Sequence, residues 1–170
     1  YKGQLTSIRS LNPDVIYVPG YYGEVGVIAK QAKQLGITAP LLGGDGWDAP
    51  QLWELGGDSL NGSFISNHYS VEDPSPAIQK FVADFRARYN IAPDALAALG
   101  YDAMRVLGDA LKRAGTSEGP ALRDAIAATK EFAGVTGVIT INAERNAVKP
   151  AVVLKLQDGK YVYQETISAD

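Results

Sequence analysis

The sequence has no cysteine, which excludes disulfide bonds, thiol catalysis and cysteine-ligated metals. Its single histidine, His68, excludes a multi-histidine metal site within this chain and leaves no defensible Ser-His-Asp triad. No uninterrupted apolar run approaches about 18 residues, so the sequence predicts no membrane span. The net charge of −3 offers no basic surface, and nucleic acid is therefore not an expected partner.

What remains is the composition of an ordinary globular protein. The 170 residues are 46% hydrophobic and 21% charged, which suits one domain or two small ones. Strands alternate with helices to about residue 66, helices dominate to about residue 129, and strands return at the end. This order predicts an α/β fold with a parallel sheet, flanking helices and a C-terminal β-hairpin around Asp158-Gly159.

A strand–helix–strand unit occupies the first third of the chain. Apolar residues at helical spacing between two short apolar runs indicate this unit, and glycines end its helix and flank its loops. The predicted order is strand Asp14–Val18, loop Pro19–Gly23, helix Glu24–Leu35, strand Pro40–Gly43 and loop Gly44–Trp47. Both loops follow strands, so they are expected at the same edge of a parallel sheet, where α/β folds bind ligands.

Tyr21 and Asp45 are the residues of these loops best suited to contact a ligand. Neighbouring strands lie about 5 Å apart, so one small molecule could touch both side chains. The alternative for Asp45 is an ordinary turn residue between glycines, and for Tyr21 simple packing. The cluster Gly43–Gly46 does not match a phosphate-binding loop, because no lysine follows it, and no cofactor is expected.

The remaining elements are predicted from apolar spacing and from proline, serine and glycine at their ends. They are a helix over Lys2–Leu11, a short helix over Asp48–Leu55, a strand over Gly62–Ser66, a polar loop over Asn67–Asp73, helices over Ser75–Tyr89, Pro93–Ala114 and Glu118–Thr129, a strand region over Val135–Ile141, a polar turn over Asn142–Lys149, and strands over Val152–Leu156 and Tyr161–Ile167. The helix after Pro93 carries an apolar stripe of Leu96, Leu99, Ala103, Leu107 and Leu111. In the helix before it, the face expected to be buried is Ile78, Phe81, Val82, Phe85 and Tyr89.

The segments Val18–Gly26 and Leu42–Asp48 resemble the second lobe of the branched-chain amino-acid-binding proteins of bacterial ABC importers, and Ala98–Ala103 also fits. The resemblance extends from about residue 2 to 167. It implies a periplasmic-binding-protein-like fold in which residues 1–91 belong to the second lobe, 92–141 return to the first lobe, and 142–170 cross back with the hairpin. Since family members are about twice as long, we expect this chain to be the C-terminal half of one, without the signal peptide or the lipid-attachment cysteine.

The resemblance also implies roles at the site. The Asp45 carboxylate would accept hydrogen bonds from a ligand ammonium, and Tyr21 would wall the cleft, with Tyr22 in its place if the loop register differs by one. Trp47 would either line the pocket or pack beneath its loop, and Gly20, with Gly44 and Gly46, would shape the backbone or donate an N–H to the ligand. Tyr69 is a weaker candidate, His68 is expected to face solvent, and Tyr101 is expected in the core.

The function implied by the resemblance is non-catalytic. It is the substrate-binding component of an ABC transporter for branched-chain or other aliphatic amino acids, with hinge closure over the ligand and presentation to a membrane permease. The expected location is periplasmic or extracellular, with a lipid anchor as one form of attachment. Alternatives are a sensory ligand-binding domain of the same fold, a binding protein for amides or aromatic acids, and an α/β enzyme with no base–nucleophile pair to support it. Exposed apolar faces over 92–141 predict self-association or pairing with the first half.

Overall fold

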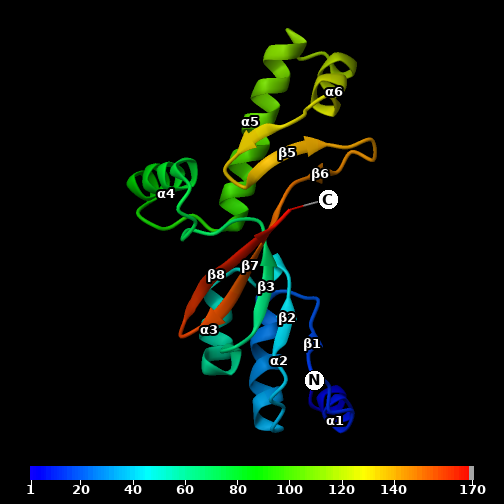
Figure 1. The fold of residues 1–170 in the computed structure, drawn as a ribbon, viewed down its shortest axis with the longest axis vertical. Coiled ribbons are helices and arrows are strands. Elements are labelled where there is room, and N and C mark those ends of the chain that lie inside the picture. The colour runs from blue at the N-terminus through cyan, green and yellow to red at the C-terminus, as the bar shows by residue number, and fades with distance from the viewer. Residues whose placement is uncertain (169–170) are drawn as a thin grey trace.

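The computed structural model describes residues 1–168, which form two groups of elements joined at a narrow waist (Figure 1). We call the lower group in Figure 1 the sheet unit and the upper group the helical unit. The sheet unit consists of α1 (Lys2–Ser10), β1 (Ile16–Tyr17), α2 (Tyr22–Gln34), β2 (Leu41–Gly43), the 3-10 turn η1 (Asp45–Trp47), α3 (Pro50–Gly56), the 3-10 turn η2 (Gly57–Leu60), β3 (Phe64–Asn67), β7 (Ala151–Gln157) and β8 (Lys160–Ile167). The helical unit consists of α4 (Pro76–Tyr89), α5 (Ala95–Ala114), α6 (Gly119–Ala127), β4 (Phe132–Gly134), β5 (Gly137–Ile141) and β6 (Ala147–Val148).

The sheet unit contains the predicted βαβ arrangement. Its five strands have the order β1-β2-β3-β7-β8, with β1, β2 and β3 parallel and β7 and β8 antiparallel. The carboxyl ends of β1, β2 and β3 therefore face the waist (Figure 1). The C-terminal hairpin is confirmed, and its turn residues Asp158 and Gly159 have φ angles of 50° and 79°, as a two-residue β-turn requires.

The core of the sheet unit lies between the sheet and its covering helices. The α2 face predicted from helical spacing is confirmed, because Val25, Ala29 and Ala32 are buried. Val25 and Ala29 belong to one core cluster with fully buried side chains of the other elements, namely Trp47, Leu52, Leu60, Ile65 and Leu156. Apolar burial of this kind contributes roughly 1.5–3 kcal/mol for each large side chain, and it fixes the loops at the ends of the strands.

Helix α4 packs against α5 and the β4–β5 turn, whereas the lobe boundary expected at residue 91 stays a prediction. Phe81 and Val82 of α4 form a buried cluster with Tyr69, with Ala98 of α5 and with Val135. The helix therefore packs on the helical unit, and the chain leaves the five-stranded sheet after Asn67. Of the face predicted for α4, Ile78 and Phe85 are partly buried, whereas Tyr89 is exposed because α4 ends there.

The buried residues of α5 are not those of the predicted apolar stripe. Ala95, Ala98, Asp102, Val106 and Ala110 are its buried residues, whereas Leu96 is 67% exposed. The Asp102 carboxylate is buried because it accepts hydrogen bonds from the Val135 and Thr136 N–H groups and the Thr136 hydroxyl, at 2.8–2.9 Å. The predicted strand region over Val135–Ile141 is correspondingly a β4–β5 hairpin whose turn Asp102 holds.

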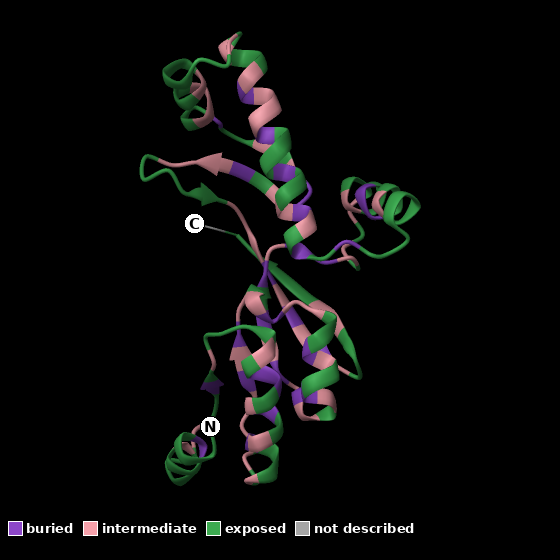
Figure 2. Ribbon diagram, turned by 180° about the vertical axis from the view of Figure 1, so that it is seen from behind, coloured by how far each residue is buried: buried purple, intermediate pink, exposed green. Residues whose placement is uncertain are grey.

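Much of α5 and α6 is exposed around a short three-stranded sheet (Figure 2). Leu99, Ala103 and Leu107 of the predicted stripe line an open apolar groove of about 620 Å³ together with Ile126, Ile139 and Ile141. Within residues 1–168, no helix combines the length and apolar character that crossing a membrane requires.

Polar groups connect the two units at the waist. The Lys149 ammonium donates to the backbone carbonyls of His68, Thr136 and Pro150 at 3.0–3.3 Å, and its burial lowers the pKa of Lys149. The Asp48 carboxylate accepts from the Asn67 amide at 3.0 Å and from the Ala95 N–H at 3.1 Å. These bonds fix the end of β3 against the start of α5.

Candidate functional site

A pocket of about 610 Å³ opens at the carboxyl ends of β1 and β2. Its walls contain four of the five residues predicted for the site, namely Gly20, Tyr21, Tyr22 and Asp45. The rest of the lining comes from β1, η1, α3 and the start of α5: Tyr17, Pro19, Gly44, Gly46, Asp48, Ala49, Pro50, Gln51, Asp94 and Leu96. The expected convergence of the two loops at one edge is thus confirmed, whereas the ligand contacts themselves stay a prediction.

The two loops touch directly at Gly46. A Cβ atom placed on Gly46 would lie 2.8 Å from the Gly20 carbonyl oxygen and 3.0 Å from the Tyr21 ring. The absence of a side chain at Gly46 therefore lets the Tyr21 ring rest against the loop that carries Asp45. Tyr21 itself is 69% exposed and precedes α2, so its ring stands at the rim of the pocket.

Gly46→Ala is expected to separate the loops and to weaken ligand binding about tenfold, because the new methyl group overlaps the Gly20 carbonyl. Gly44→Ala is the matched control, since a Cβ at Gly44 meets only the Ser66 hydroxyl at 4.0 Å. Calorimetry of ligand binding to the two variants measures the difference. Equal affinities would show that the contact at Gly46 does not position Tyr21.

Asp45 lies at the pocket rim and pairs with His68. The His68 Nε2 and Asp45 Oδ2 atoms are 3.1 Å apart, and their side chains are 36% and 51% exposed. The expectation that His68 faces solvent was therefore incomplete: it lies in the predicted loop after β3, but its imidazole contacts the acid carried by the neighbouring strand. The parallel register places both residues at the same sheet edge.

Trp47 packs beneath its loop and does not line the pocket. The side chain is fully buried, its indole lies against Gly43, and its N–H donates to the Val18 carbonyl at 3.3 Å. Tyr161 of β8 completes the support by donating its hydroxyl to the Trp47 carbonyl at 2.7 Å. Of the two alternatives for Trp47, the structure therefore selects the packing role.

Among residues 1–168, three carboxylates line the pocket, and no lysine, arginine or histidine does. Asp94 caps α5 by accepting from the Ala97 N–H at 2.7 Å, and burial raises the pKa of Asp48. Asp48, Asp94 and Leu96 also line the pocket, although they were not predicted from the sequence. Asp48 directly follows the predicted loop Gly44–Trp47, so its position gave a signal, whereas Asp94 precedes a helix and nothing local places it at this edge of the sheet.

The weaker candidates lie elsewhere. Tyr69 is 3% exposed and packs edge-on against Phe81, inside the helical unit. Tyr101 is 45% exposed, so its expected place in the core was wrong, although its ring contacts Phe81 with a centroid distance of 4.8 Å. Neither lines the pocket. Among the described residues, no group of three or more acidic or histidine side chains could hold a metal ion.

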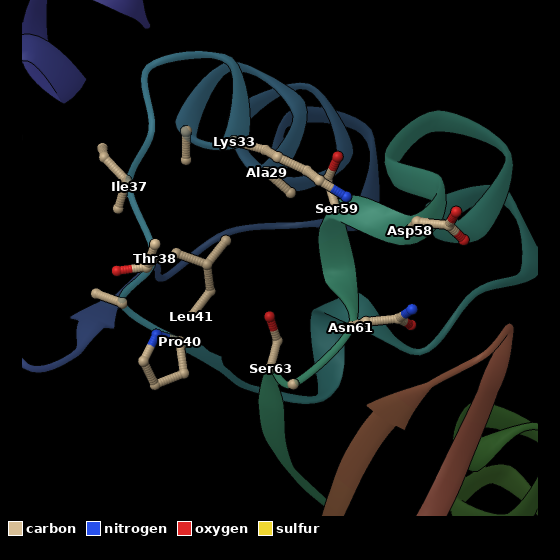
Figure 3. A pocket seen from close by; sticks show the side chains of 13 residues that line it. Ala29, Lys33, Ile37, Thr38, Pro40, Leu41, Asp58, Ser59, Asn61 and Ser63 are labelled. Carbon is tan, nitrogen blue, oxygen red and sulfur yellow. The ribbon is translucent and has the colours of Figure 1, made fainter.

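A second pocket of about 620 Å³ lies at the opposite end of the sheet (Figure 3). It opens where β2 and β3 begin, between the end of α2 and η2, with Ile37 and Thr38 on one side and Asp58 and Asn61 on the other. The polar side chains of this pocket lie on opposite sides, and the pocket itself lies at the amino ends of the strands. The carboxyl-end pocket, where Tyr21 and Asp45 meet, is therefore the candidate site.

The profile of a family described as periplasmic binding protein matches residues 1–160. The Leu/Ile/Val-binding protein BraC3 of Rhizobium johnstonii is 32% identical over 162 residues, which are 94% of this chain and 44% of that protein. The chain thus spans less than half the length of this relative.

Solved structures agree with the sequence matches. The leucine binding protein LivK of Thermotoga maritima superposes with a TM-score of 0.93 and 41% identity, covering 99% of this chain and 48% of that one. LivJ of Streptococcus pneumoniae, solved with isoleucine, gives 0.86 and 31% with the same coverage. A solute binding protein of R. palustris, solved with benzoate, gives 0.82 and 28%, again over 99% and 48%.

Proposed function

Since the chain belongs to the periplasmic binding protein family, we propose that it forms half of the ligand site of an ABC-transporter substrate-binding protein for branched-chain or other aliphatic amino acids. The observation that carries this proposal is the half-exposed Asp45 carboxylate beside the Tyr21 ring at the rim of one pocket. Asp45 accepts the ligand ammonium, and Tyr21 covers the ligand from the other loop. Tyr22 and the Gly20 backbone are the remaining proposed contacts.

The charge of the pocket favours a ligand with an ammonium group. In the part of the chain that the structure describes, Asp45, Asp48 and Asp94 line the pocket and no basic side chain does, so an amine is attracted there and a lone carboxylate is repelled. Benzoate, the ligand of one similar structure, carries no such ammonium. The pocket therefore supports an amino acid over the aromatic-acid alternative for this chain.

The two units correspond to parts of two lobes in this proposal. The sheet unit is the second lobe, and the helical unit, including α4, belongs to the first lobe, whose other elements come from the half of the relatives that this chain does not match. The crossovers are then residues 68–75 and 149–150, where Lys149 and Asp48 form the waist contacts. Ligand binding shifts the protein toward the form in which the lobes close.

The proposed partner is a membrane permease that receives the closed, non-catalytic binding protein. Membership of a periplasmic family supports a location outside the cytoplasmic membrane. Attachment by a lipid is a finer proposal, which mass spectrometry of the mature amino terminus tests. The exposed apolar groove along α5 supports self-association of the isolated chain, which light scattering measures.

We expect this chain by itself to bind leucine, isoleucine and valine at least about 100-fold more weakly than the full-length protein does. The reason is that one lobe supplies only part of the ligand contacts. Calorimetry with both proteins measures the ratio, with benzoate as the ligand that lacks an ammonium. Tight leucine binding by the monomeric chain would contradict the two-lobe site. If benzoate bound and none of the three amino acids did, the proposed ligand class would be wrong.

A further inference from the structure

His68 is the one side chain that hydrogen-bonds to the Asp45 carboxylate among the described residues. The His68 Nε2 and Asp45 Oδ2 atoms lie 3.1 Å apart, and the Asp45 carboxylate has no other hydrogen-bond partner within residues 1–168. His68 engages a single carboxylate oxygen. The second oxygen, Oδ1, is left for a ligand at the pocket rim.

The backbone of His68 is held on both sides. Its N–H donates to the Asn67 side-chain oxygen at 2.8 Å, and its carbonyl accepts from the Lys149 ammonium at 3.3 Å. The Asn67 amide in turn donates to Asp48 at 3.0 Å. The imidazole is therefore presented to Asp45 by a fixed main chain, although it lies in a loop.

We propose that His68 is a positioning residue for Asp45, and that its protonation makes ligand binding depend on pH. The inference rests on the proposed role of Asp45. With a neutral imidazole, His68 donates one hydrogen bond that orients the carboxylate and leaves its negative charge for the ligand ammonium. With a protonated imidazole, the same contact becomes an ion pair, and the added positive charge repels the incoming ammonium.

The groups that face His68 set the sign of this effect. Asp45 approaches from η1, Lys149 bonds its carbonyl, and Asp102 shares the adjacent groove. Asp48 lies one hydrogen bond away through Asn67, and Asp48 and Asp94 are the other carboxylates that line the pocket. A variant that changes only the imidazole separates these contributions, because Asp48, Asp102 and Lys149 remain in place.

The test measures the leucine affinity of the full-length protein and of its His68→Gln variant between pH 5 and 8. Glutamine keeps a hydrogen-bond donor for Asp45 but does not titrate. The wild-type protein is expected to bind about tenfold more weakly at pH 5 than at pH 8, since binding competes with one proton. The leucine affinity of His68→Gln is expected to lose this tenfold change between pH 5 and pH 8 and to be near that of the wild type at pH 8. His68→Ala is expected to lose affinity at every pH, because nothing orients the carboxylate.

A second readout needs no ligand. The imidazole resonances of His68, assigned by their loss in His68→Gln, are expected to move when Asp45 is replaced by asparagine. Unchanged resonances in Asp45→Asn would overturn the inference, whatever the protein binds. So would a pH profile that is identical in wild type and His68→Gln. Absence of leucine binding at every pH, with the resonance shift intact, would instead overturn the proposed ligand class and leave the His68–Asp45 contact standing.

Discussion

Replacing Asp45 by alanine is expected to weaken amino-acid binding by the full-length protein at least about 100-fold. The carboxylate is the only group proposed to pair with the ligand ammonium, and loss of one partner of a desolvated charge pair costs about 2–5 kcal/mol. Little stability should be lost, because the pair with His68 is half exposed and contributes about 1 kcal/mol or less. Calorimetry of leucine binding and thermal unfolding of the same variant measure the two quantities separately.

Asp58→Ala provides the matched control for this prediction. Asp58 is also an exposed aspartate on a 3-10 turn, but it lies at the opposite end of the strands (Figure 3). It should therefore leave leucine affinity unchanged. An Asp45→Ala protein that folds normally and still binds leucine with unchanged affinity would remove the basis of the proposed function.

The strand–loop positions of the site could be predicted because the information is local. The switch from apolar runs to helical spacing, with glycines on either side, places Tyr21 and Asp45 after neighbouring parallel strands. Nothing local indicates that His68, 23 residues later, contacts Asp45. That contact depends on the register between β2 and β3, which pairs Gly43 with Ile65.

Burial in the helical unit was harder to predict than in the sheet unit. An aspartate inside a helix, such as Asp102, is typical of a solvent-exposed face, yet Asp102 is 2% exposed. Its place is set by the backbone amides of Val135 and Thr136, more than 30 positions away in the sequence. Leu99 and Leu107 of α5 lie along an open groove, so apolar spacing alone did not locate the buried face of this helix.

Trp47→Ala is expected to produce the largest loss of stability, about 3–5 kcal/mol, because it empties a fully buried site and removes the indole hydrogen bond to Val18. Trp53, the only other tryptophan, is the control: it is half-buried, packs edge-on against Tyr161 and has no partner for its indole N–H within residues 1–168. In urea unfolding of the full-length protein, the free energy of unfolding should therefore be much lower for Trp47→Ala than for Trp53→Ala.

A third variant, Trp47→Phe, separates support of the loop from contact with the ligand. If Trp47 acts only beneath the loop, ligand affinity in Trp47→Phe should recover with stability, because a phenyl ring fills most of the space against Gly43. A Trp47→Phe protein with wild-type stability but strongly reduced affinity would mean that the indole reaches the ligand. The buried indole, the Tyr161 hydroxyl on the Trp47 carbonyl and the bare Gly46 together hold Asp45 at the rim, so stability and binding should change together.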